Sequence, residues 1–275
     1  MHSYLLGAVV PRPIALASTI DNAGNVNLSP FSFFNVFSAN PPIMIFSPAR
    51  RGRDNTTKHT YENVKEVPEV VIHIVTHSIV EQISLASCEY PKGVNEFIKA
   101  GLTEVPSLVV RPPRVAESPV AFECKVNQVI ELGNSGAAGN LVICEVLRMH
   151  ISEEVLDPDG RINPFKLDAI ARMGADYYMR AQKPNIFTVL KPNDKLGIGI
   201  DQLPERIRIS RILTGNDLGK LANVEQVPDR EAVSSPELVS AGKQGEESLH
   251  GLAQQMLQAG DVNGAWQVLL ASLKD

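Results

Sequence analysis

The first 150 residues alternate short apolar segments with turn residues, and this rhythm limits the fold more than any other feature. Apolar segments of the β type lie at residues 9–10, 14–17, 26–29, 43–46, 70–75, 122–132 and 141–150. Asx and glycine residues at 21–25, and a glycine-rich stretch at 133–139, mark turns between consecutive segments. The intervals are too short for regular crossover helices. The pattern therefore predicts a mainly β protein, an antiparallel β-barrel with a few helices, rather than a doubly wound parallel sheet.

Two short helices are expected among these strands. Residues 78–81 have the spacing of a capping box, and Ile79, Ile83 and Ala86 then fall on one helical face. Residues 61–67 are expected to form the second helix, which Pro68 ends.

The last part of the chain changes in character. Residues 228–247 are polar and read as a linker. Beyond them, apolar residues keep helical spacing on both sides of a break at 259–261. Residues 248–275 are therefore predicted to form a helical hairpin.

Charge and cysteine content exclude several classes of protein. The chain has 26 Lys and Arg against 31 Asp and Glu, a net charge of −5 that argues against broad contact with nucleic acid. No apolar run approaches the roughly 18 to 20 residues of a membrane span, and the first residues do not resemble an export signal. Three widely spaced cysteines without a CxxC pair argue against a disulfide framework and a structural zinc site. Together these features predict a cytoplasmic protein without a membrane or metal partner.

Residues 50–60 form the sharpest local anomaly. Four cations (Arg50, Arg51, Arg53 and Lys58) accompany one acid and three threonines, directly after a predicted strand and before a predicted helix. Charged donors, hydroxyl groups and a helix N-terminus together are suited to a phosphate. The alternative is a solvated basic loop.

Residues 27–35 form the second anomaly. Pro30 removes a donor from the strand ladder, so the strand should end or bulge there. Serine hydroxyls alternate with Phe31, Phe33 and Phe34 in this segment. The mixture is suited to a slot for a flat ring with a polar edge, and the alternative is plain barrel core.

Several standard signatures are absent from the sequence. It contains no GxxxxGK[ST] phosphate loop, no complete GxGxxG dinucleotide fingerprint and no GxSxG nucleophile elbow. Residues 157–160 resemble the start of a calcium loop but lack the later ligands, so they predict a tight turn.

Taken in order, these segments resemble the flavin reductase-like, FMN-binding split-barrel family. The resemblance covers about residues 5–180 and is carried by residues 9–15, 18–19, 27–35, 40–43, 46–48, 58–60, 116–120, 139–143 and 172–178. It implies a six-stranded Greek-key split barrel that forms a homodimer, with FMN near the subunit interface. The barrel domain is then residues 1–182. Residues 183–227 are expected to be an extension that packs along the barrel or across the dimer.

The resemblance also assigns residues to the FMN site. Those on the ring and ribityl side are Asn27, Ser29, Pro30, Phe31 and Ser32. Those on the phosphate side are Ser47, Lys58 and Thr60, with Arg50 and Arg53 as extra cations and Arg12 as a contact of flavin or substrate. The family usually has an acidic residue where this chain has His59, so any contact of that acid is not carried over.

The function that the resemblance implies is that of an FMN-dependent oxidoreductase, in which NAD(P)H delivers a hydride to the flavin. Two alternatives remain. One is an electron-transfer protein that keeps FMN and receives electrons from a protein partner. An electron-acceptor protein is a further candidate partner of the reduced flavin. The other is a binding or scaffold protein in which the barrel is not catalytic.

Overall fold

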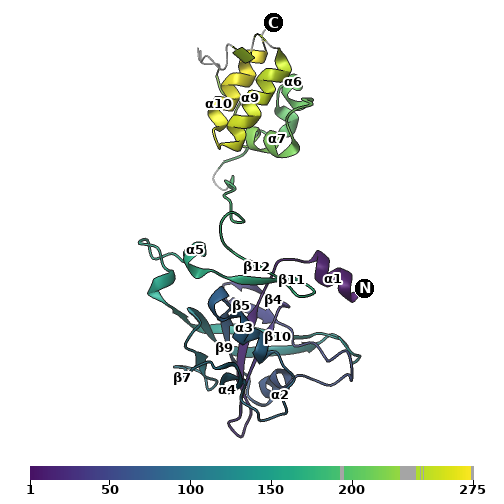
Figure 1. The fold of residues 1–275 in the computed structure, drawn as a ribbon, viewed down its shortest axis with the longest axis vertical. Coiled ribbons are helices and arrows are strands. Elements are labelled where there is room, and N and C mark those ends of the chain that lie inside the picture. Colours follow the sequence, from purple (N-terminus) through teal and green to yellow (C-terminus); the bar gives the residue numbers. More distant parts are fainter. Residues whose placement is uncertain (193–194, 230–239, 242, 244, 274–275) are drawn as a thin grey trace. The chain divides into compact units, whose positions relative to one another are not determined.

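The computed structural model describes residues 1–192, 195–229, 240, 241, 243 and 245–273. The chain divides into two compact units, Met1–Phe187 and Thr188–Asp275 (Figure 1). Buried apolar side chains form clusters within each unit, so each has a hydrophobic core of its own.

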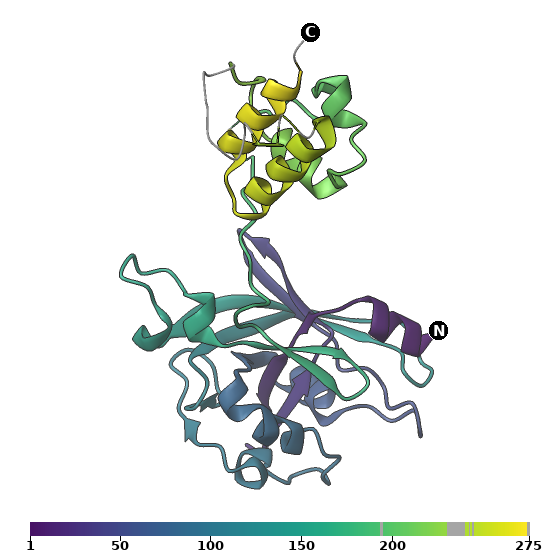
Figure 2. The same ribbon diagram turned by 45° about the horizontal axis from the view of Figure 1, so that its top comes forward.

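A seven-stranded sheet forms the frame of the first unit, and neighbouring strands pair antiparallel (Figure 2). The strand order is β3-β2-β6-β9-β10-β5-β4. The bounds are Ala15–Ile20 for β2, Val26–Phe31 for β3, Phe34–Ala39 for β4, Pro42–Phe46 for β5, Glu69–Ile74 for β6, Val120–Glu131 for β9 and Asn140–Ile151 for β10. This confirms the predicted mainly β, antiparallel architecture.

Two smaller sheets accompany this frame. They consist of β1 (Arg12–Pro13), β11 (Ile170–Gly174) and β12 (Tyr177–Arg180), and of β7 (Glu104–Val105) with β8 (Arg114–Val115). The predicted strand at residues 9–10 is wrong, because α1 (His2–Ala8) precedes it and β1 begins only at Arg12. Sequence reasoning also missed β4, whose largely exposed residues show no apolar alternation.

Short helices cover parts of the frame. They include α2 (His59–Glu66), α3 (Val80–Ala86), α4 (Glu96–Ala100) and α5 (Pro164–Leu167). Ile79, Ile83 and Ala86 are buried together, as predicted. The predicted capping box is wrong, because a 3-10 turn at His77–Ile79 precedes α3 and Ser78 Oγ bonds to Thr76 Oγ1 at 2.9 Å.

The second unit is a small helical body. Its elements are a 3-10 turn at Ile200–Gln202, α6 (Glu205–Arg208), α7 (Gly215–Leu221), α9 (Glu246–Gln258) and α10 (Val262–Ser272). Helices α9 and α10 lie side by side (Figures 1 and 2), which confirms the predicted hairpin. Trp266 is fully buried against Leu257 and Leu269, and its ring nitrogen donates to Leu221 O at 3.2 Å.

The segment before the hairpin differs from the expectation. Residues 183–227 are expected to pack along the barrel or across the dimer, whereas apolar residues from Ile198 to Val227 share the core of the helical hairpin. On its own, the hairpin would leave an apolar stripe exposed to solvent, and residues 198–227 cover this stripe. The predicted linker at 228–247 lies for the most part outside the described residues.

Candidate functional site

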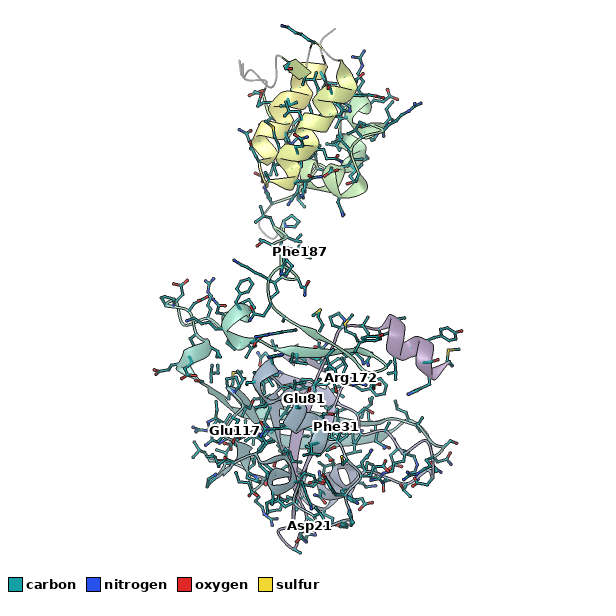
Figure 3. All side chains as sticks on the ribbon, viewed as in Figure 1. Asp21, Phe31, Glu81, Glu117, Arg172 and Phe187 are labelled. Atoms are coloured by element: carbon teal, nitrogen blue, oxygen red, sulfur yellow. The ribbon has the colours of Figure 1, made fainter. Side chains whose placement is uncertain are left out.

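The end of β3 supplies one side of the site. This strand pairs with β2 and lies at an edge of the seven-stranded sheet, the position where a proline without an N–H is tolerated. The strand ends at Phe31, one residue later than the sequence suggested. Phe31, labelled in Figure 3, is 8% exposed, and its ring centroid lies 5.4 Å from that of Phe46. The strand end is therefore anchored in the barrel core.

Residues 50–58, here called the cationic loop, supply the opposite side. The loop is held by the turn between β9 and β10, because Arg50 N donates to Ala138 O at 2.8 Å and Ala137 N donates to Arg50 O at 3.1 Å. A Cβ at Gly136 would lie 3.1 Å from Gly52 O. The glycine-rich turn therefore lets the backbones of the two loops come close together.

One pocket of about 390 Å³ lies between the strand end and the cationic loop. Its aromatic end consists of Pro30, Phe31 and Phe33, and its cationic end consists of Arg50, Arg51, Arg53 and Lys58. The wall also includes Ser29, Ser32, Ser47 and Ser87. The structure thus brings the two sequence anomalies, which are separate in the chain, to a single cavity.

Most of the residues predicted for the site line this pocket. They are Ser29, Pro30, Phe31, Ser32, Ser47, Arg50, Arg53 and Lys58. Asn27 and Thr60 line a small neighbouring pocket together with Ser29 and Lys58, and Asn27 Nδ2 donates to Thr60 Oγ1 at 2.9 Å. These ten residues form one continuous surface.

Arg12 lies elsewhere. Its side chain is buried, and Nη1 donates to Leu6 O at 2.5 Å and to Val9 O at 2.9 Å. These carbonyls belong to the end of α1 and the residue after it, where carbonyl groups lack partners within the helix. Arg12 therefore fixes α1 to β1, and it is not among the residues that line the pocket.

Sequence reasoning missed Glu89, a carboxylate at the cationic end. Its oxygens lie 3.1 Å from Arg51 Nε, 2.8 Å from Arg53 Nη2 and 3.6 Å from Lys58 Nζ. Partial burial raises the pKa of Glu89, but the three cations outweigh this effect and hold the pKa below its usual value. Since Glu89 is 31 residues after Lys58 in sequence, no local pattern indicated that they meet.

A second pocket of about 240 Å³ adjoins the first and shares Pro30, Ser32 and Ser87 with it. Its other lining residues include Ile14, Val80, Ile83, Arg172 and Tyr178. The Arg172 guanidinium lies 4.6 Å from the centre of the Tyr178 ring, a cation–π arrangement. The two pockets offer neighbouring spaces for two ligands.

Two buried side chains of the barrel that could be reactive, Cys124 and His73, have structural roles. Burial raises the pKa of Cys124 to about 12 and lowers the pKa of His73 to about 4. His73 Nδ1 lies 2.9 Å from Leu16 O, and Nε2 accepts from Val115 N at 2.9 Å. Among the described residues, no cluster of three or more His, Cys, Asp or Glu is placed to bind a metal. Every described helix is also too short or too polar to cross a membrane.

The fold and the comparisons with known proteins place the chain in one class, the flavin-related oxidoreductases with a split-barrel fold. Residues 6–166 match the family model described as flavin reductase like domain. The chain belongs to this family, and the matched residues lie within its first unit.

Individual proteins support this assignment. A protein of Aquifex aeolicus is 38% identical over 181 residues, which cover 66% of this chain and 90% of that protein. The structure of nitrilotriacetate monooxygenase component B from Bacillus cereus matches with a TM-score of 0.62 and 30% identity, over 69% of this chain and 91% of that one. A structure from Shewanella frigidimarina, described as a flavin reductase with a split barrel domain, matches with a TM-score of 0.59 and 28% identity, over 68% and 91% of the two chains. The predicted split-barrel fold and family are confirmed.

Proposed function

We propose that this protein binds FMN in the larger pocket and reduces it with NAD(P)H. The observation that carries the proposal is that cations, hydroxyl groups and aromatic rings from separate segments line one cavity of about 390 Å³. Cofactor sites usually occupy about 300–1,000 Å³. The residues present therefore fit a ligand with a flat ring at one end and a phosphate at the other.

The phosphate is assigned to the cationic end. Arg51 and Arg53 offer guanidinium donors and Lys58 offers an ammonium group, and charge-assisted bonds of this kind are the strong ones. Ser47 Oγ accepts from Asn140 N at 3.0 Å, which leaves its own proton free to donate to a ligand. Ser47 is thus a neutral donor beside the charged ones.

The ring is assigned to the aromatic end. Phe31 is fixed by its packing on Phe46, and Pro30 has a rigid backbone, so this end is shaped before a ligand arrives. The Asn27–Thr60 hydrogen bond holds the neighbouring polar wall in place. The protein would then bind the ring with little loss of its own conformational freedom.

FMN, when bound, would supply the redox chemistry by accepting a hydride at N5. The task of the chain is to hold the two ends of the cofactor and to leave room for the hydride donor. The second pocket, with an apolar floor, serine hydroxyls and Arg172, is our candidate for the nicotinamide side.

A second candidate function is electron transfer to a protein partner. It is favoured by the similarity to a protein named as component B of a monooxygenase. In that case the reduced flavin passes its electrons to an electron-acceptor protein.

We also propose that the protein acts as a homodimer in the cytoplasm. Val36 is 61% exposed and Phe37 is 64% exposed on the edge strand β4, and Leu147 and Met149 are exposed on β10. Exposed apolar residues are typical of protein–protein contacts where they form a patch, and these four are our candidates for the dimer surface. A purified monomer at micromolar concentration in analytical ultracentrifugation would refute the dimer.

The proposed location in the cytoplasm is supported by the three free cysteines, which suit a reducing compartment.

One experiment tests the function. The purified protein is mixed with FMN, its visible spectrum is recorded, and NADH and NADPH oxidation are followed with and without free flavin. The proposal predicts a perturbed flavin spectrum and nicotinamide oxidation that depends on flavin. A bound flavin without oxidation of either nucleotide would favour the electron carrier. Absence of flavin binding would overturn both and leave the non-catalytic binding protein.

A further inference from the structure

We propose that Glu89 occupies the place of the ligand phosphate in the flavin-free protein and that FMN must displace it to bind. This inference rests on the proposed function. Three of the four cations of the cationic end contact one carboxylate, at 2.8 to 3.6 Å. Glu89 also lines the pocket itself, so its carboxylate lies on the surface that a phosphate would contact.

The carboxylate and a phosphate compete for the same donors. The Arg51 and Arg53 groups that point to Glu89 are the groups best suited to a phosphate, because guanidinium donors match both kinds of anion. A phosphomonoester has three acceptor oxygens and a charge of about −1.5 to −2, against two oxygens and one charge for Glu89. The phosphate is therefore the stronger partner, but it must first break the existing ion pairs.

Glu89 can leave the site at low cost. It is 40% exposed, and it follows the turn at the end of α3 instead of lying within a strand. Glu123 offers a contrast, because it is fully buried and accepts backbone N–H groups from Leu108 and Val109. A half-exposed carboxylate held by side chains can move into water without leaving an unpaired buried charge.

The ion pairs of Glu89 should therefore affect the affinity for FMN but not the affinity for riboflavin. Riboflavin has no phosphate, so its binding at the aromatic end does not require Glu89 to move. Glu89 thus weakens FMN binding selectively and favours a flavin that exchanges over one that is held permanently.

The test is a titration of wild-type protein, Glu89→Gln and Glu62→Gln with FMN and with riboflavin, followed by flavin fluorescence. Glu62 is the matched control, because it is a similarly exposed carboxylate that pairs with Lys92 at 3.6 Å and with none of the cations that line the pocket. It also accepts from Thr57 Oγ1 of the cationic loop at 2.7 Å, and the amide oxygen of glutamine can still accept that bond. We expect Glu89→Gln to lower the Kd for FMN about three- to tenfold and to leave the Kd for riboflavin within about twofold. Glu62→Gln should change neither value by more than about twofold.

Suppose that the wild-type protein binds FMN and that the Kd for FMN in Glu89→Gln is unchanged or higher. This result would overturn the inference and leave the proposed function intact. Thermal unfolding with inorganic phosphate provides a readout without flavin. Phosphate should raise the Tm of Glu89→Gln more than that of wild type or Glu62→Gln. If no variant binds either flavin, the proposed function fails. In that case, a larger rise in Tm with phosphate in Glu89→Gln would still support displacement of Glu89 by an anion. An equal rise in all three proteins would overturn this displacement too.

Discussion

The two ends of the pocket are built in different ways. The aromatic end belongs to the barrel frame, since Phe31 ends a strand and packs in the core. The cationic end is a loop, and its charged groups are held by side-chain contacts such as that of Arg51 with Glu89. The difference teaches that shape is provided by the frame and charge by the loop. Substitutions at the two ends should therefore affect stability and ligand choice separately.

The largest effect is expected from Phe31→Ala, which removes a buried ring at the aromatic end. We expect the free energy of unfolding of the barrel to fall by about 3–5 kcal/mol. FMN and riboflavin should both bind more weakly, because both have the ring. Urea unfolding and flavin titration measure these changes, with Phe187→Ala, at an exposed site, as the control. A loss of less than about 1 kcal/mol would contradict the assigned role of the ring in the frame.

Lys58→Ala tests the cationic end. We expect FMN binding to weaken by about 1.5 to 3 kcal/mol through loss of a charge-assisted bond, with riboflavin binding and stability unchanged. Lys92→Ala is the control, because Lys92 pairs with Glu62 and does not line the pocket. Equal weakening for both flavins would show that Lys58 does not meet the phosphate.

Acid should lower the stability of the barrel through protonation of the buried His73. Burial lowers the pKa of His73 in the folded protein to about 4, below the usual histidine value of about 6.5, so the unfolded chain takes up the proton first. Stability from neutral His73 is therefore present above pH 6.5 and is lost as the pH falls from 6.5 toward 4. Between pH 7 and 5, we expect wild type to lose about 1–2 kcal/mol more stability than His73→Asn. The check is urea unfolding at the two pH values. Equal losses in the free energy of unfolding for wild type and His73→Asn would contradict the assigned role of His73.

The smallest effect is expected from removal of the second unit. Its core is built from its own residues, and the pocket is lined by residues of the first unit. A chain that ends at Phe187 should therefore bind FMN with a Kd within about twofold of the full chain. Loss of flavin binding in this truncation would show that the second unit contributes to the site.

The barrel frame and the aromatic and cationic ends of the pocket could be predicted from the sequence, because they depend on local patterns. Strand alternation and the cluster of cations at 50–58 are visible in short windows. Glu89 was missed because its partners are far away in the chain, and the contacts of Arg12 with α1 were missed because they depend on the folded N-terminal segment. The packing of residues 198–227 was missed for the same reason, since their partners are in the terminal hairpin.

The most direct test of the account is the ratio of the Kd values for riboflavin and FMN in the wild-type protein. The account predicts that FMN binds at least about tenfold more tightly, because the cationic end contacts the phosphate. The ratio should fall toward one at high salt, which screens exposed charges. Equal affinity for the two flavins at low salt would contradict the assignment of the cationic loop to the phosphate.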